Sequence, residues 1–145
     1  MTSTTMASQQ AALATLLARA GALAYFIWAL LHFQAAWLVY KLGVSMPPGM
    51  ASGRVQQDAW NLLCFATIAI VATVFNWRND VRGWWTNLVV VSATDIGFIA
   101  FVLVPGYMPW WPGALGPIFW IVGLLFSTAA VLVNRRKNTR FDTTG

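Results

Sequence analysis

The stretch that decides the fold is WWTNLVVVSATDIGFIAFVLV, residues 84–104. A helix needs about 20 mostly apolar residues to cross the hydrocarbon core of a bilayer, and this stretch has that length. It carries one ionisable side chain, Asp95, near its middle. Because burying a carboxylate at that depth costs at least about 3 kcal/mol, we expect a polar partner and a functional role for Asp95.

The composition of the whole chain agrees with this stretch. Of its 145 residues, 59% are hydrophobic and only 9% are charged, with a mean hydropathy of +0.63. Soluble domains carry about 25% charged residues. The sequence therefore predicts an all-α integral membrane protein of one domain, a four-helix transmembrane bundle with antiparallel up-down connections. The predicted spans are 20–42, 58–76, 84–104 and 114–133, between a small, polar N-terminal tail (1–19) and a basic C-terminal tail (135–145).

The basic residues lie mainly on the side of the predicted bundle that holds the two termini. Lys41 and Arg54 fall on the opposite side. Cytoplasmic loops carry an excess of Lys and Arg, so both termini should be cytoplasmic. The basic residues on the terminal side are Arg19, Arg78, Arg82, Arg135, Arg136, Lys137 and Arg140. The net charge of +5 is not accompanied by interleaved aromatic and basic residues on a polar face, so we expect membrane lipids as partners and no nucleic acid.

His32, the only histidine, is the natural partner for Asp95. It lies near the middle of the first span, at a depth similar to that of Asp95, and helical periodicity puts it on one stripe with Tyr25 and Trp28. Such a pair can hold one proton, and it could serve acid-base catalysis on a lipophilic substrate or its proton-linked movement. The alternative is a structural hydrogen bond that fixes the helix register.

A pocket around this pair would be lined by polar and aromatic side chains. Ser92, three residues before Asp95, can donate a hydrogen bond to it. Asn61 would carry polar groups from the membrane surface down into the bundle. The residues expected to line the pocket are Tyr25, Trp28, Asn61, Ser92, Phe98 and Trp120.

The connections are rich in proline and glycine. After the loop 43–51, Ser52 is expected to cap the second helix, and Arg54 and Asp58 are spaced to form an ion pair at the membrane surface. The uncharged segment 105–113, PGYMPWWPG, should lie in the membrane interface as an aromatic flap. Alternatively, the same flap roofs a cavity.

A stripe of small residues runs along the last span. Gly116, Gly123 and Ser127 share one face, which allows close approach of another helix backbone. This face predicts a packing seam, either within one protomer or between two. In the second case it would mediate a homo-oligomer or bind a partner membrane subunit.

Several functions fail for lack of residues. One histidine excludes a bis-histidine haem, and His32, Cys64 and Asp95 lie on separate spans without metal-site spacing, so we expect no cofactor and no metal. The single cysteine also excludes an intrachain disulfide. Two hypotheses remain. The first is a non-enzymatic accessory subunit or binder of a hydrophobic small molecule, which we favour because one His and one Asp make a sparse active site. The second is a membrane isomerase or cyclase of an isoprenoid-like or steroid-like lipid, with Asp95 and His32 as its acid-base pair.

Overall fold

The computed structural model describes residues 3–142, with side chains for residues 8–135. This part of the chain is helical and contains no strand, which confirms the predicted all-α class. The elements are α1 (Ser3–Ser45), α2 (Met50–Trp77), α3 (Val81–Thr86), the π-helix η1 (Asn87–Val91), α4 (Ser92–Phe98), the π-helix η2 (Ile99–Leu103), α5 (Trp110–Gly113) and α6 (Leu115–Asp142).

Four helices are long and apolar enough to cross a membrane, judged by length and composition. They cover Ser8–Ser45, Met50–Trp77, Val81–Leu103 and Leu115–Arg135, and each contains most of one predicted span. Their ends differ from the prediction. The stretch predicted as a tail over 1–19 is already helical from Ser3, because Ala, Leu and Gln favour a helix and no Gly or Pro precedes Gly21. The basic tail is helical up to Asp142, and residues 1–2 and 143–145 lie outside the described residues.

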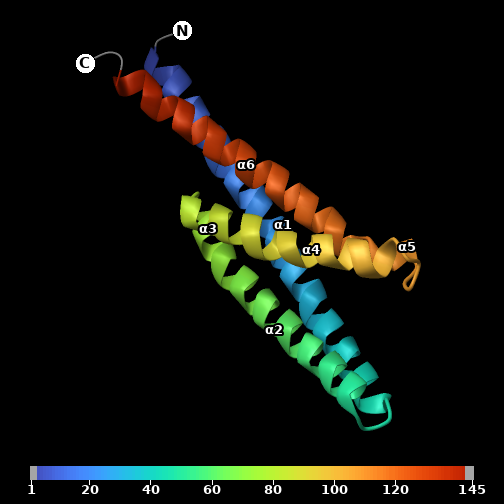
Figure 1. Cartoon of the computed structure of the whole chain (residues 1–145). Helices are drawn as coiled ribbons and strands as arrows, with labels where there is room; N and C mark the ends of the chain where they lie inside the picture. The colour runs from blue at the N-terminus through green and yellow to red at the C-terminus, as the bar shows by residue number, and fades with distance from the viewer. Residues whose placement is uncertain (1–2, 143–145) are drawn as a thin grey trace.

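The longest helix, α1, organises the others (Figure 1). It packs against α2 along its C-terminal part and against α6 along its N-terminal part, and α2 and α6 diverge from one another. The run from α3 to η2 crosses between them and contacts both. The N-terminal end of α1 and the C-terminal end of α6 lie close together at one end of the molecule.

The third long helix is interrupted by two π-helical stretches, and these decide which side chains it buries. In an α-helix every fourth residue advances about 40° past a full turn, so four such steps would carry Leu103 almost to the side opposite Asn87. Nevertheless, the buried residues of this helix include four at that spacing: Asn87, Val91, Asp95 and Leu103. A π-helix has wider turns, and η1 and η2 therefore compensate for the drift.

The corner between α1 and α2 corrects two predictions. Ser52 does not cap α2, which begins at Met50 after Gly49. Its buried hydroxyl instead donates to the carbonyl oxygen of Gly43 at 2.7 Å, which ties the first turn of α2 to the end of α1. The predicted ion pair does not form among the described residues, because the Arg54 guanidinium donates to the Gln57 side-chain oxygen at 2.9 Å rather than to Asp58.

The small-residue stripe of α6 packs against α1 of the same chain. A Cβ atom added to Gly21 would lie 2.9 Å from the backbone nitrogen of Ser127 and 3.1 Å from the carbonyl oxygen of Gly123. The two backbones are therefore in direct contact, as small residues permit. At this face the structure shows a seam within one protomer.

Candidate functional site

Asp95 lies at the centre of the described core. Its side chain, on α4, is completely buried, as are those of Tyr25 and Trp28 on α1. The indole nitrogen Nε1 of Trp28 donates a hydrogen bond to Oδ2 of Asp95 at 2.5 Å, which joins the two helices. Buried tryptophan N–H groups usually find such a partner. We call Tyr25, Trp28, His32 and Asp95 the Asp95 cluster.

The structure brings His32 and Asp95 to one place without a direct bond between them. The His32 ring stacks on Trp28, with ring centroids 3.6 Å apart and an interplanar angle of 22°. A Cβ atom added to Gly116 of α6 would lie 3.2 Å from Cε1 of His32 and 3.4 Å from Oδ1 of Asp95, so both side chains adjoin this glycine. No hydrogen bond or ion pair joins them among the side chains that the structure describes. Trp28 takes the position on the carboxylate that the sequence suggested for His32.

The hydrogen bond of His32 determines which ring nitrogen is available. Nδ1 lies 2.9 Å from the carbonyl oxygen of Trp28, one turn earlier on α1. A carbonyl only accepts, so Nδ1 carries the proton. In the neutral ring, Nε2 then holds the lone pair, and a Cβ atom on Gly116 would lie 3.9 Å from it. The histidine therefore offers a hydrogen-bond acceptor beside the carboxylate.

One oxygen of Asp95 has no partner. Oδ1 is buried and accepts no hydrogen bond from any described residue. The Tyr25 hydroxyl, the Asn76 amide nitrogen and both polar atoms of the Asn87 side chain share this state. Buried polar atoms are almost always hydrogen-bonded to protein or water, so each such atom requires an explanation. For Asp95 the cost of leaving the atom unpaired is the greatest, because a carboxylate is the hardest of these groups to desolvate.

The other predicted pocket residues are only partly gathered around Asp95. Ser92 does not donate to Asp95, and its hydroxyl accepts a hydrogen bond from Nε1 of Trp120 at 2.9 Å, which links α4 to α6. Phe98 is half-buried on the same helix as Asp95. Asn61 is exposed on α2 and is not a member of the cluster. The sequence predicts that Trp28 lines the pocket, but it does not identify Trp28 as the hydrogen-bond donor to Asp95. The position of Trp28 on the same helical stripe as His32 is the signal that could have indicated this role.

The aromatic flap does not cover the cluster. Tyr107 is 82% exposed and Trp111 71% exposed, so their rings project away from the helices. The flap contains the single turn α5 and packs only lightly against α6. The structure therefore gives no support to the alternative in which the flap roofs a cavity.

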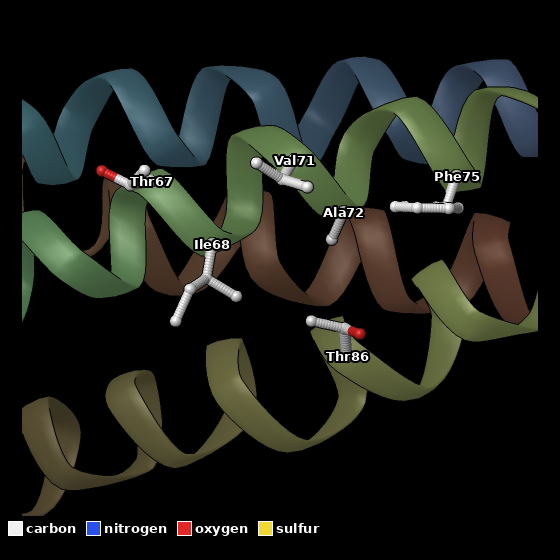
Figure 2. Close-up of a pocket in the computed structure, with 6 residues that line it drawn as sticks. All are labelled: Thr67, Ile68, Val71, Ala72, Phe75 and Thr86. Carbon is white, nitrogen blue, oxygen red and sulfur yellow. The ribbon is translucent and has the colours of Figure 1, made fainter.

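Two grooves lie along α2, and neither is lined by a member of the Asp95 cluster. The smaller, of about 210 Å³, lies between α2 and the helix that carries Thr86, and Figure 2 shows Ile68 and Ala72 pointing into it. Its lining is almost entirely apolar. The larger, of about 610 Å³, lies between α1 and α2, and we call it the hairpin groove. Its lining includes Phe33, Trp37, Tyr40, Gln57, Trp60 and Leu63.

The next question is whether these side chains could bind a metal ion. Among the described side chains, no group of three or more His, Cys, Asp or Glu residues is placed to hold a metal ion. No known protein family matches the sequence, and no curated protein or solved structure is significantly similar to the chain. The function must therefore be argued from the chemistry of the site itself.

Proposed function

We propose that this chain is a four-span integral membrane protein that binds a hydrophobic small molecule with its polar end at Asp95. The spans would run antiparallel, with both termini in the cytoplasm, where the basic residues are concentrated. Large apolar side chains support a lipid environment, because they are exposed along every long helix. They include Leu30 on α1, Val71 on α2, Phe101 on η2 and Leu125 on α6.

The observation that carries the ligand site is the unpartnered Oδ1 of Asp95. Trp28 satisfies the other oxygen, and Oδ1 remains beside Gly116 and His32 with no donor. An ionised carboxylate there would favour a ligand with a hydroxyl or protonated amine, which supplies the missing donor. Because Gly116 has no side chain, the backbone of α6 lies directly against these two polar groups. The apolar body of the ligand would extend between the helices toward the lipid.

The geometry of His32 supports a second candidate, an isomerase or cyclase of an isoprenoid-like or steroid-like lipid. Since Nδ1 is held by a carbonyl, Nε2 is free to take up a proton close to the Asp95 carboxyl group. A carboxyl group and an imidazole at one place can act as acid and base on the same substrate. In this reading the ligand that satisfies Oδ1 is also the substrate.

Mass spectrometry of lipid extracts from the purified protein tests the binding site. We expect the wild-type protein to retain one molecular species that Asp95→Asn loses, because Asn can still accept the Trp28 hydrogen bond but carries no charge. Asp58→Asn, on the exposed part of α2, is the matched control and should retain the species. Circular dichroism should show the same helix content in all three proteins.

Two results would overturn the binding proposal: no retained species in several detergents, or equal retention by Asp95→Asn. The second candidate makes a different prediction. Incubation with the wild-type protein should then convert the retained molecule to an isomer, and Asp95→Asn should not.

A further inference from the structure

The hairpin groove has a graded chemistry that the Asp95 cluster does not explain. Its floor consists of Ala36 and Ala59, which are both buried, so the small side chains leave space between α1 and α2. Two indole rings flank this space, Trp37 at 61% and Trp60 at 63% exposure. The volume of about 610 Å³ falls within the range of about 300–1,000 Å³ typical of small-molecule sites.

One end of the groove is polar and the other is apolar. Gln56 and Gln57 line the end near the connection between α1 and α2, while Phe33 and Leu63 line the other. Since an α-helix rises about 1.5 Å per residue, the apolar end lies roughly 10 Å further along α2. In the proposed membrane orientation, this gradient runs from the surface toward the hydrocarbon core. An amphiphile that stands in a leaflet has the same gradient.

Two cations stand at the polar end. The hydrogen bond of 2.9 Å from Arg54 to Gln57 holds the guanidinium at the rim of the groove. Lys41 is exposed and follows Tyr40, which also lines the groove. One acidic residue, Asp58, also lies beside this end, next to Gln57 in sequence; like Lys41 and Arg54 it is exposed and is not part of the lining, and it forms no ion pair with Arg54 in the described part of the chain. Two cations against one anion give this end of the groove a net positive charge.

We propose that the hairpin groove binds an acidic phospholipid. Arg54 and Lys41 contact the phosphate, Gln57 donates or accepts a hydrogen bond at the headgroup, and one acyl chain lies between Trp37 and Trp60. This proposal rests on the membrane location put forward above but not on a ligand at Asp95. Charge gives the groove its preference for the headgroup, and the indole rings give it affinity for the chain.

Native mass spectrometry of the full chain in detergent tests the proposal with two probes, dioleoylphosphatidylglycerol and dioleoylphosphatidylcholine. Each basic residue near a membrane surface contributes about 1 kcal/mol toward anionic lipid, so two should give the wild-type protein a preference of about tenfold or more for the anionic probe. The double variant Lys41→Gln/Arg54→Gln should lose this preference. Arg78→Gln, an exposed arginine in the connection between α2 and α3, is the matched control and should keep it.

The indole rings are tested separately. Trp37→Leu/Trp60→Leu should weaken binding of both probes while retaining the preference between them, and both rings are exposed enough to be replaced without loss of fold. The proposal is overturned if the wild-type protein shows no headgroup preference, if Arg78→Gln lowers the preference as much as the double variant, or if the groove is filled by a second copy and the spectrum shows lipid-free dimers. None of these outcomes bears on whether Asp95→Asn loses its own ligand, so the two proposals fail independently.

Discussion

The Asp95 cluster and the hairpin groove share one helix, α1, yet the cluster is closed and the groove is open. At the cluster, α1 lies against α6 and is bonded to α4, and Trp28 is fully buried with its N–H bonded to a carboxylate. At the groove, α1 faces α2, and Trp60 remains mostly exposed. The glycines of α6 make the difference, because they let its backbone approach α1 closely. A tryptophan side chain is therefore part of the buried core in the cluster and part of the exposed surface in the groove.

Gly21→Val should break the closed region, with the largest effect of the variants considered. Its Cβ atom would lie 2.9 Å from a backbone nitrogen of α6, and neither helix can yield without losing the seam. Overpacking of this kind costs typically 1–3 kcal/mol, and we expect about 3 kcal/mol here because the clash is with backbone. Denaturation in mixed micelles would measure the loss of unfolding free energy.

Gly97→Ala provides the control for that measurement, since nothing lies within 4 Å of a Cβ atom at this position on α4. Its unfolding free energy should be unchanged or slightly higher, because alanine favours a helix. If both variants lose equal stability, close contact between α1 and α6 is not the cause.

Replacing the same residue type in each region sharpens the comparison. Trp28→Phe removes the one hydrogen bond that the carboxylate of Asp95 accepts from the described side chains and leaves both of its oxygens without a partner there, so the unfolding free energy should fall by about 1–3 kcal/mol. Trp60→Phe, in the open groove, should stay within about 0.5 kcal/mol of the wild-type protein. Equal losses would show that the Trp28–Asp95 bond adds nothing to stability.

The smallest expected effect is at the corner between α2 and α3, outside both regions. Asp80 caps α3 by accepting from the backbone nitrogen of Arg82 at 2.9 Å. Hydrogen bonds from the Arg82 side chain also hold the pKa of Asp80 below its usual range. Because a lowered pKa stabilises the fold above the unfolded-state value, near 4, this contribution is lost as the pH falls through the folded-state pKa.

Asp80→Ala should therefore lower the Tm slightly at pH 7, and the difference from the wild-type protein should shrink as the pH falls below about 4. Thermal melting of both proteins at pH 7 and at a pH below about 4 measures this difference in Tm. Asp58→Ala, which removes an exposed acid that caps no helix, is the control and should leave the Tm at pH 7 unchanged. A difference for Asp80→Ala that persists at low pH would mean that the carboxylate charge is not involved.

Hydropathy and length were enough to predict the all-helical class and the four long apolar helices. They were poor guides to the ends of helices, since Ser52 resembles a cap in sequence but is held by Gly43 of the preceding helix. Periodicity placed Trp28 and His32 on one stripe of the first span. It could not show which side chain reaches the carboxylate, because that depends on how α1 and α4 cross and on the rotamer of an indole ring usually counted as apolar.

The glycine spacing on α6 predicted a seam but did not identify Gly21 of α1 as its partner. Asn87 shows the same limit from the other side. Its complete burial depends on the π-helical stretch in which it lies, and the residue types of 87–91 do not indicate a wide turn.

That wide turn lets the third long helix carry one surplus residue without turning Asp95 out of the core. If η1 lost a residue such as the exposed Val89, the remaining chain would fit an ordinary α-helix without a break. The rotation of about 100° that a deletion causes in a regular helix would be largely offset by the loss of the wide turn, so Asp95 would keep its inward aim and move about 1.5 Å along the helix axis toward α3. A single missing codon at this place therefore spares the site as well as the helix that carries it.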